Sequence, residues 1–248
     1  MQHDWNQRAR EDAHFYVAFG RRDQDNEEFF ATGAEVVAGL DWEMRRLPPS
    51  RPRARRALEI GCGPGLYARR LAARFEEIRV VGIDRSNAQL ERARSRAARA
   101  GLGNCRFELG DATALPHPEG SADAVVLSRL LAVVEDRGQV LAEAHRVLRP
   151  GGRCFVAAPR SSLRAGIPIA AMPLASWLGS GPSGPRRAIA SADRVEVLDS
   201  DTFGALLRSQ PWQRLSEWAD ADYQYAVLDK AVGMAEETAA AIPAVTGR

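Results

Sequence analysis

The sequence predicts an α/β fold with a mostly parallel sheet and helices on both faces of that sheet. Three observations predict it: apolar runs alternate with helix-like segments between residues 54 and 159, a glycine-rich loop follows the first run, and no internal repeat is visible. The 248 residues are 45% hydrophobic, which is enough for one sizeable domain or two small ones.

Five parallel strands are expected where short apolar runs end in turn-forming residues. These runs are residues 57–60, 78–84, 105–111, 121–128 and 154–159. Helices are expected between them, from about 66 to 75, 86 to 100 and 136 to 148. After a short helix near 201–209, two runs at 212–218 and 223–229 alternate polar and apolar residues, which predicts an antiparallel pair at the sheet edge.

Two segments lie outside this pattern. Apolar residues at roughly helical spacing predict an N-terminal helical cap that ends near residue 47. The uncharged run from Ala165 to Pro185 contains four prolines, so we expect an apolar loop or lid and no membrane helix. The expected organisation is a cap over 1–50, a main domain over 51–230 that includes the lid at 160–192, and a tail over 231–248.

The composition argues against several classes of partner. With 34 Lys+Arg and 32 Asp+Glu the formal net charge is +2, so no global field attracts nucleic acid or an anionic membrane. The three cysteines, Cys62, Cys105 and Cys154, have no CxxC spacing, so neither a disulfide framework nor a metal site is expected. No apolar signal region opens the chain, and we expect a cytoplasmic protein.

The most informative motif is the loop of residues 61–65, which follows the first expected strand and precedes a helix. Three glycines, Gly61, Gly63 and Gly65, are spaced by two. Glycine adopts positive φ and lets a ligand approach the backbone, and the N-terminus of the following helix presents unpaired N–H groups. We therefore expect an anionic or polar group to be held at this loop.

An acidic residue, Asp84, ends the next expected strand, where a carboxylate accepts hydrogen bonds from the hydroxyls of a ribose. The loop and Asp84 together indicate a ligand that contains a nucleoside. A dinucleotide fingerprint would need G-x-G-x-x-G, whereas position 66 is leucine. Glu59 would repel a pyrophosphate but suits an ammonium group, so a ligand with an amino-acid end and a ribose fits better than NAD.

A family resemblance rests on four segments: LEIGCGPG (58–65), VVGIDRS (80–86), LGDATALPHPEGSADAVVL (109–127) and HRVLRPGG (145–152). On these segments the chain resembles the class I S-adenosylmethionine-dependent methyltransferases, most closely the small-molecule branch (methyltransferase type 11-like) that includes ubiquinone and menaquinone methyltransferases. The resemblance covers roughly residues 54–159. It implies a Rossmann-like sheet of seven strands in the order 3-2-1-4-5-7-6, with strand 7 antiparallel.

The resemblance also implies roles for single residues toward S-adenosylmethionine, whose product is S-adenosylhomocysteine. The methionine part would be held by the first strand's acid and the loop, the ribose by Asp84, the adenine by the turn after the third strand and by Arg85, and Ser128 would lie beneath the sulfonium. The residues expected at the cofactor are Tyr16, Glu59, Gly61, Cys62, Gly63, Gly65, Asp84, Arg85, Asp111, Ala112 and Ser128.

No general base can be identified from the sequence. His14 and Tyr16, in the expected cap, are candidates for contact with cofactor or substrate, and ordinary helix packing is the alternative. His117 is expected to face solvent in a loop, and His145 to be a surface or packing residue. Where relatives often carry an aromatic residue or histidine after the fourth strand, this chain has Ser128-Arg129-Leu130-Leu131, which argues against a histidine-based acceptor site there.

These patterns favour an enzyme that transfers a methyl group in line from S-adenosylmethionine to oxygen, nitrogen or carbon of a small molecule. The run from Ala165 to Pro185 follows the fifth strand and is expected to form a wall of an apolar acceptor pocket. Two alternatives stay open: a catalytically silent cofactor-binding subunit or regulator, and an NAD(P)-dependent oxidoreductase. The sequence does not indicate an oligomeric state.

Overall fold

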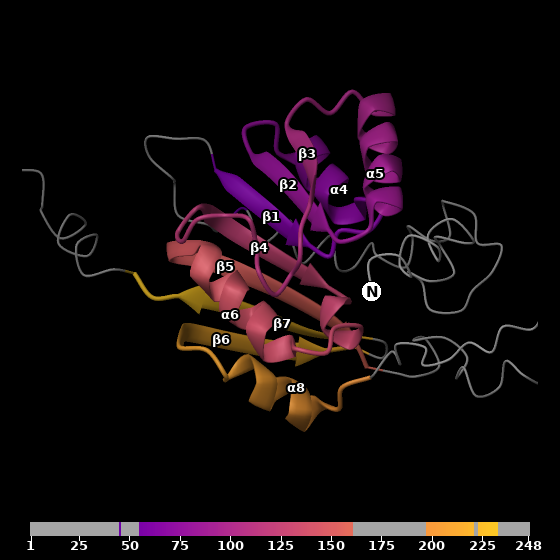
Figure 1. Cartoon of the computed structure of the whole chain (residues 1–248). Helices are drawn as coiled ribbons and strands as arrows, with labels where there is room; N and C mark the ends of the chain where they lie inside the picture. Colours follow the sequence, from indigo (N-terminus) through magenta and orange to yellow (C-terminus); the bar gives the residue numbers. More distant parts are fainter. Residues whose placement is uncertain (1–44, 46–54, 161–196, 221–222, 233–248) are drawn as a thin grey trace, which may run out of the picture.

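A computed structural model describes residues 45, 55–160, 197–220 and 223–232 of the chain (Figure 1). The expected N-terminal cap, the lid and the C-terminal tail lie outside the described residues, apart from Arg45, Arg160 and residues 231–232.

The described residues form the alternating pattern that the sequence predicts. In chain order they contain β1 (Arg56–Ile60), α4 (Leu66–Arg74), β2 (Arg79–Asp84), α5 (Asn87–Arg99), β3 (Cys105–Leu109), β4 (Ala122–Ser128), the 3-10 turn η1 (Leu130–Ala132), α6 (Arg137–Val147), β5 (Leu148–Pro159), α8 (Ser200–Leu207), β6 (Trp212–Ala219) and β7 (Tyr223–Lys230). Helix ends agree with the expected ones to within about two residues.

The strands form one sheet in the order β3-β2-β1-β4-β5-β7-β6. Strands β1 to β5 pair in parallel, and β7 pairs antiparallel with both β5 and β6. This confirms the α/β fold class and the antiparallel edge pair that the sequence predicts, and the strand order that the family resemblance implies.

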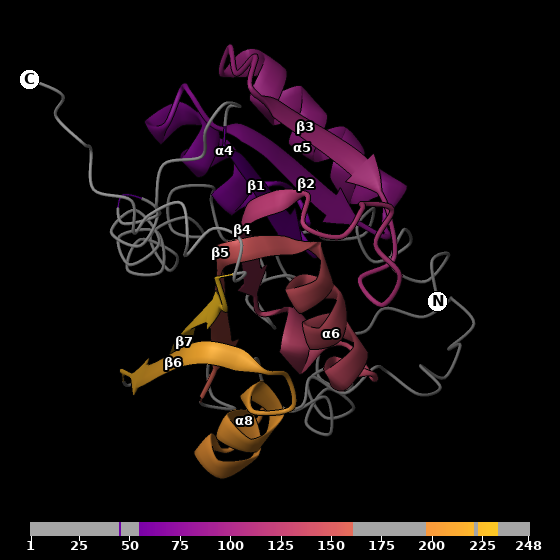
Figure 2. The same ribbon diagram turned by 90° about the vertical axis from the view of Figure 1, so that its left-hand side faces the viewer.

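Side chains alternate between two core layers because successive residues of a strand point to opposite faces. One layer joins Ala57, Val126 and Phe155 to α4 and α5, and the other joins Leu58, Ile60 and other strand residues to α6 and α8. Figures 1 and 2 show α6 and α8 along the β4, β5, β7 and β6 part of the sheet. Both faces are therefore covered, as a parallel sheet requires.

Three helices start at side-chain caps that the sequence carries in the expected places. Ser86 accepts a hydrogen bond from Gln89 N (3.4 Å) at α5, and Asp199 accepts one from Thr202 N (2.8 Å) at α8. Asp136 does the same for α6. Such caps satisfy amides that have no partner inside the helix, and so they define where each helix begins.

The fifth strand is longer than the sequence predicts. The sequence predicts a turn at RPGG and a strand from Cys154. β5 begins at Leu148, but its pairing with β4 passes from Leu148 directly to Arg153, and Gly151 has a φ of 70°, so residues 149–152 form an irregular bulge within the strand. A buried acid lies beside this bulge. The Asp123 carboxylate accepts a hydrogen bond from Arg56 N (2.7 Å) and an ion pair from Arg149, which ties the starts of β1, β4 and β5 together.

Among the described residues, no helix is long and apolar enough to cross a bilayer. The same residues contain no group of three or more His, Cys, Asp or Glu side chains close enough together to bind a metal ion.

Asp123→Ala is expected to lower the free energy of unfolding by about 3 kcal/mol, because it removes a buried acceptor from both an arginine and a backbone amide. Urea unfolding measures this change. The control is Glu217→Gln, which breaks the exposed Arg208–Glu217 pair and should cost less than about 1 kcal/mol. Equal losses in the two variants would contradict the role given to Asp123.

Candidate active site

The loop between β1 and α4 has the backbone shape that its glycines predict. Gly61, Gly63 and Gly65 have φ of 73°, 50° and 73°. The loop is fixed to β2, since the amides of Gly61 and Cys62 both donate to Ile83 O, at 2.8 and 2.9 Å. A side chain with a β carbon rarely adopts this φ, so the loop requires glycine here.

Packing excludes larger side chains at the same positions. A β carbon on Gly61 would lie 2.8 Å from the Leu130 side chain, and one on Gly65 would lie 2.6 Å from the Phe107 ring. The first glycine brings the loop close to the turn after β4, and the third brings α4 close to β3. The loop is therefore a tightly packed cradle at the carboxyl end of the sheet, where ligands of open α/β sheets bind.

Asp84, the last residue of β2, connects this loop to the next one. Its Oδ2 accepts a hydrogen bond from Gly63 N and its Oδ1 accepts one from Ser86 N, both at 2.8 Å. Burial raises the pKa of Asp84, and these two amides act in the opposite direction. Each carboxylate oxygen has two lone pairs, so both oxygens keep acceptor capacity for the hydroxyls of a ligand.

Glu59 lies beneath the loop and is 3% exposed. Its Oε2 accepts a hydrogen bond from Ala68 N (2.6 Å), so the side chain also caps the first turn of α4. Burial raises the pKa of Glu59 to about 8, and the nearby charge of Asp84 adds to this. The loop therefore lies between two acidic groups, which disfavours a pyrophosphate and favours a cation.

The residues expected at the adenine lie beside the end of β2. Asp111 is exposed, and its Oδ1 accepts hydrogen bonds from Thr113 N (2.9 Å) and Thr113 Oγ1 (2.7 Å). These bonds lower the pKa of Asp111, and the Arg85 charge lowers it further. Since Gly110 N donates to Asp84 O (3.1 Å), the turn that carries Asp111 and Ala112 adjoins Asp84.

Ser128 ends β4, where it pairs in register with Ala157 of β5. The side chains of Ser128 and Val126 point to the same face of the sheet, because strand residues two apart share a face, and Val126 belongs to the core layer of α4. The structure thus brings the loop, Asp84 and Ser128 to one end and one face of the sheet.

Three residues beside Ser128 were not singled out as site residues: Tyr67, Arg129 and Tyr223. Arg129 follows β4 directly, and its Nη2 donates a hydrogen bond to the Tyr223 hydroxyl. Burial raises the pKa of Tyr67, and the Arg129 charge and the Ser128 hydroxyl act against it. Tyr67 could have been found, because it lies in the first turn after the loop. Tyr223 could not, because its position depends on how β7 pairs with β5.

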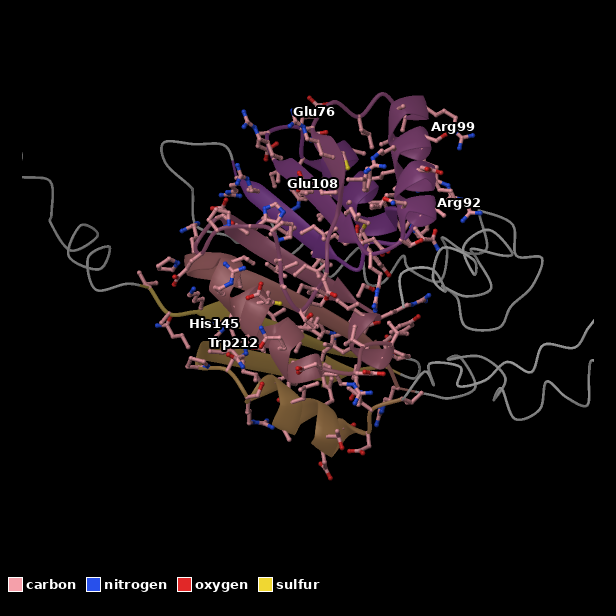
Figure 3. All side chains as sticks on the ribbon, in the orientation of Figure 1. Glu76, Arg92, Arg99, Glu108, His145 and Trp212 are labelled. Atoms are coloured by element: carbon pink, nitrogen blue, oxygen red, sulfur yellow. The ribbon has the colours of Figure 1, made fainter. Side chains whose placement is uncertain are left out.

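The remaining candidates have structural surroundings. Cys62 is buried, and burial raises the pKa of its thiol far above the usual range, which agrees with its not being a nucleophile. The expectation for His117 is wrong: its side chain is only 10% exposed and lies 3.4 Å from Glu108. His145 packs against Trp212, with ring centroids 4.8 Å apart. Figure 3 labels these two neighbouring side chains. His14 and Tyr16 lie outside the described residues.

The described residues fit S-adenosylmethionine better than a dinucleotide. A group held at the loop would meet backbone atoms, because Gly61, Gly63 and Gly65 carry no side chain. The two acidic groups on either side, Glu59 and Asp84, suit a ligand with an ammonium group, a sulfonium and a ribose.

Comparison with known proteins supports the same interpretation. Residues 57–152 match a family described as a methyltransferase domain. The chain is 44% identical over 99 residues to 27-O-demethylrifamycin SV methyltransferase of Amycolatopsis mediterranei (40% of this chain, 36% of that protein). It is 39% identical over 118 residues to demethylmenaquinone methyltransferase of Deinococcus radiodurans (46% of this chain, 48% of that protein). The matched part thus spans less than half the length of these curated relatives.

Solved structures share the fold over a larger part of the chain. An S-adenosylmethionine-dependent methyltransferase from Methanosarcina mazei has a TM-score of 0.55 at 19% identity, covering 77% of this chain and 98% of that one. At this identity the likeness concerns the fold alone. The strand order and the glycine loop with its two acids agree with the match of residues 57–152 to a methyltransferase domain.

Proposed function

We propose that the chain is an enzyme that transfers a methyl group from S-adenosylmethionine to oxygen, nitrogen or carbon of a small-molecule acceptor. One observation carries the proposal: a loop with three left-handed glycines lies between the two acidic groups of Glu59 and Asp84. The curated relatives, which include a rifamycin and a menaquinone methyltransferase, support the small-molecule acceptor.

Roles for the cofactor residues follow from their placement. Asp84 would bind the ribose hydroxyls, and Arg85, Asp111 and Ala112 would border the adenine, since their turn adjoins the end of β2. The loop residues Gly61, Cys62, Gly63 and Gly65 would hold the methionine part together with Glu59, and Ser128 would lie near the sulfonium. We also propose that Tyr16 and His14, which lie outside the described residues, contact the cofactor or the acceptor. They would belong to a cap over 1–50, and a lid at 160–192 would border the acceptor. The main domain would span 51–230, with a tail over 231–248 after it.

The chemistry of the transfer puts limited demands on the protein. When bound, S-adenosylmethionine supplies a methyl group that its sulfonium already activates. The chain then has to align the acceptor with that methyl group and exclude water, and orientation of this kind is worth about 7–11 kcal/mol of a reaction barrier. Burial raises the pKa of Glu59, and a cation bound at the loop would lower it again, so that Glu59 would ionise on binding and stabilise that cation.

Asp84→Asn is expected to weaken the binding of S-adenosylhomocysteine by about 10- to 100-fold, since an amide is a poorer acceptor for hydroxyl groups than a carboxylate. Isothermal titration calorimetry measures this. Asp199→Asn is the matched control, because Asp199 also caps backbone amides but lies at α8. Binding of NADH in place of S-adenosylhomocysteine would contradict the proposal, and so would a failure to methylate any member of a panel of phenols, amines and quinols.

Glu59→Gln is expected to flatten the pH dependence of stability in the cofactor-free protein. The pKa of Glu59 is raised from 4.5 to about 8. The folded chain therefore binds more protons than the unfolded chain between these values, and stability falls as the pH rises through this range. The contribution is at most about 1.4 kcal/mol for each pH unit.

Urea unfolding between about pH 5 and pH 8 tests this expectation. The wild-type chain should lose more stability over the range than Glu59→Gln, which keeps an acceptor for Ala68 N. Glu77→Gln, at an exposed position just before β2, should follow the wild type. Parallel pH profiles for the wild type and Glu59→Gln would contradict the assignment.

A further inference from the structure

The strand order separates the two ends of the site. Asp84 ends β2, the glycine loop follows β1 and Arg129 follows β4, in the order in which these strands lie across the sheet. Tyr223, the first residue of β7, pairs with Pro159 at the end of β5, so it also lies at the carboxyl end of the parallel strands. Neighbouring strands are about 4.8 Å apart, so Tyr223 is two strand spacings beyond β4, on the side away from Asp84. With a nucleoside at β2, this side faces the acceptor.

The backbone at Arg129 is held in an uncommon conformation. Arg129 has a φ of 61° and is, within the part of the chain that the structure describes, the one non-glycine residue with positive φ. Its amide donates to Ala157 O of β5 (2.8 Å), and its carbonyl accepts from Ala132 N (3.2 Å). The strand therefore ends in a turn fixed on both sides, and such outliers concentrate at ligand sites.

The Arg129 side chain is oriented by the first residue of β7. Its Cζ lies 5.3 Å from the centroid of the Tyr223 ring, and its Nη2 donates to the Tyr223 hydroxyl. Arg129 is half-buried and Tyr223 is buried. A guanidinium fixed over an aromatic ring has the planar fork that binds a carboxylate with two parallel hydrogen bonds, and partial burial strengthens such bonds.

The charges at the two ends of the site have opposite signs. Glu59 and Asp84 flank the loop at β1 and β2, whereas Arg129 and Tyr223 lie toward β7. The Tyr67 phenol contributes a further hydroxyl beside Arg129, and burial raises its pKa, which keeps it protonated as a donor. The acidic end suits a cationic cofactor, and the end toward β7 suits an anion.

We infer that Arg129 and Tyr223 bind a carboxylate group of the methyl acceptor. This inference rests on the proposed function, because the acceptor lies at this end only if the nucleoside lies at Asp84. The same chemistry has a second source in the carboxylate at the amino-acid end of the cofactor, so the experiment has one arm for each.

The first arm measures the binding of benzoate and of benzamide, its uncharged counterpart, to the full chain saturated with S-adenosylhomocysteine. The wild type should bind benzoate and not benzamide, and Arg129→Gln should lose at least about tenfold in benzoate affinity. Tyr223→Phe should lose about threefold, because it removes the hydroxyl that orients the guanidinium. Matched controls are Arg106→Gln, at an exposed arginine of β3, and Tyr225→Phe on β7; both should bind like the wild type.

The second arm compares S-adenosylhomocysteine with 5′-methylthioadenosine, which lacks the amino-acid end. Both should bind Arg129→Gln as they bind the wild type, which also shows that the variant is folded. If only S-adenosylhomocysteine is weakened, the carboxylate belongs to the cofactor and the assignment to the acceptor is overturned.

The inference is also overturned if the wild type does not bind benzoate, if benzamide binds equally, or if Arg129→Gln leaves benzoate binding unchanged. Failure of the wild type to bind S-adenosylhomocysteine contradicts the proposed function instead. In that case benzoate titration without cofactor still decides whether Arg129 binds a carboxylate.

Discussion

The hydrogen bond from Gly63 N to the Asp84 carboxylate (2.8 Å) is the contact on which the geometry of the site depends. It joins the loop after β1 to the end of β2, two segments that meet only because Ile60 and Ile83 are in register in the parallel pair. The same register lets the amides of Gly61 and Cys62 donate to Ile83 O. The loop therefore has its shape before any ligand arrives, which lowers the conformational cost of binding.

This arrangement costs stability in the cofactor-free protein. Two acidic groups lie close enough to raise each other's energy when ionised, and Glu59 is removed from water. Placing a cation at the loop reverses both effects, since it neutralises the repulsion and replaces lost solvation. Residues that weaken a fold in the absence of ligand and strengthen it in the presence of ligand are typical of binding sites. The glycines of the loop also lower the stability of the ligand-free fold, because they have no side chain to pack. Their absent side chains let a ligand approach the backbone.

Local patterns in the sequence predict the strands, the helices and the glycine loop with Asp84, whereas the strand order comes from the family resemblance. The glycine spacing and Asp84 lie within one β-loop-α-β unit, so their placement follows from short-range geometry. The errors arose where distant segments meet. RPGG is predicted to be a turn before the fifth strand, whereas it forms a bulge inside β5, where Arg149 pairs with the buried Asp123. His117 was expected to face solvent, but it is largely buried beside Glu108 of β3. Neither contact leaves a signal in the local sequence.

The same limit explains why Arg129 was read only as a departure from the family pattern. Arg129 follows β4 in the sequence, in the segment where relatives often have an aromatic residue or histidine. The neighbouring sequence does not indicate which residue its side chain contacts. Its partner Tyr223 lies almost a hundred residues further along the chain, and the antiparallel register of β5 and β7 brings the two together. Replacing a titratable side chain by a permanently charged one changes what this position is able to do. A guanidinium is a poor base, so in the proposed acceptor site Arg129 would orient a substrate and would not deprotonate it. Acceptors that need no base, or that arrive already ionised, are the ones such a site suits.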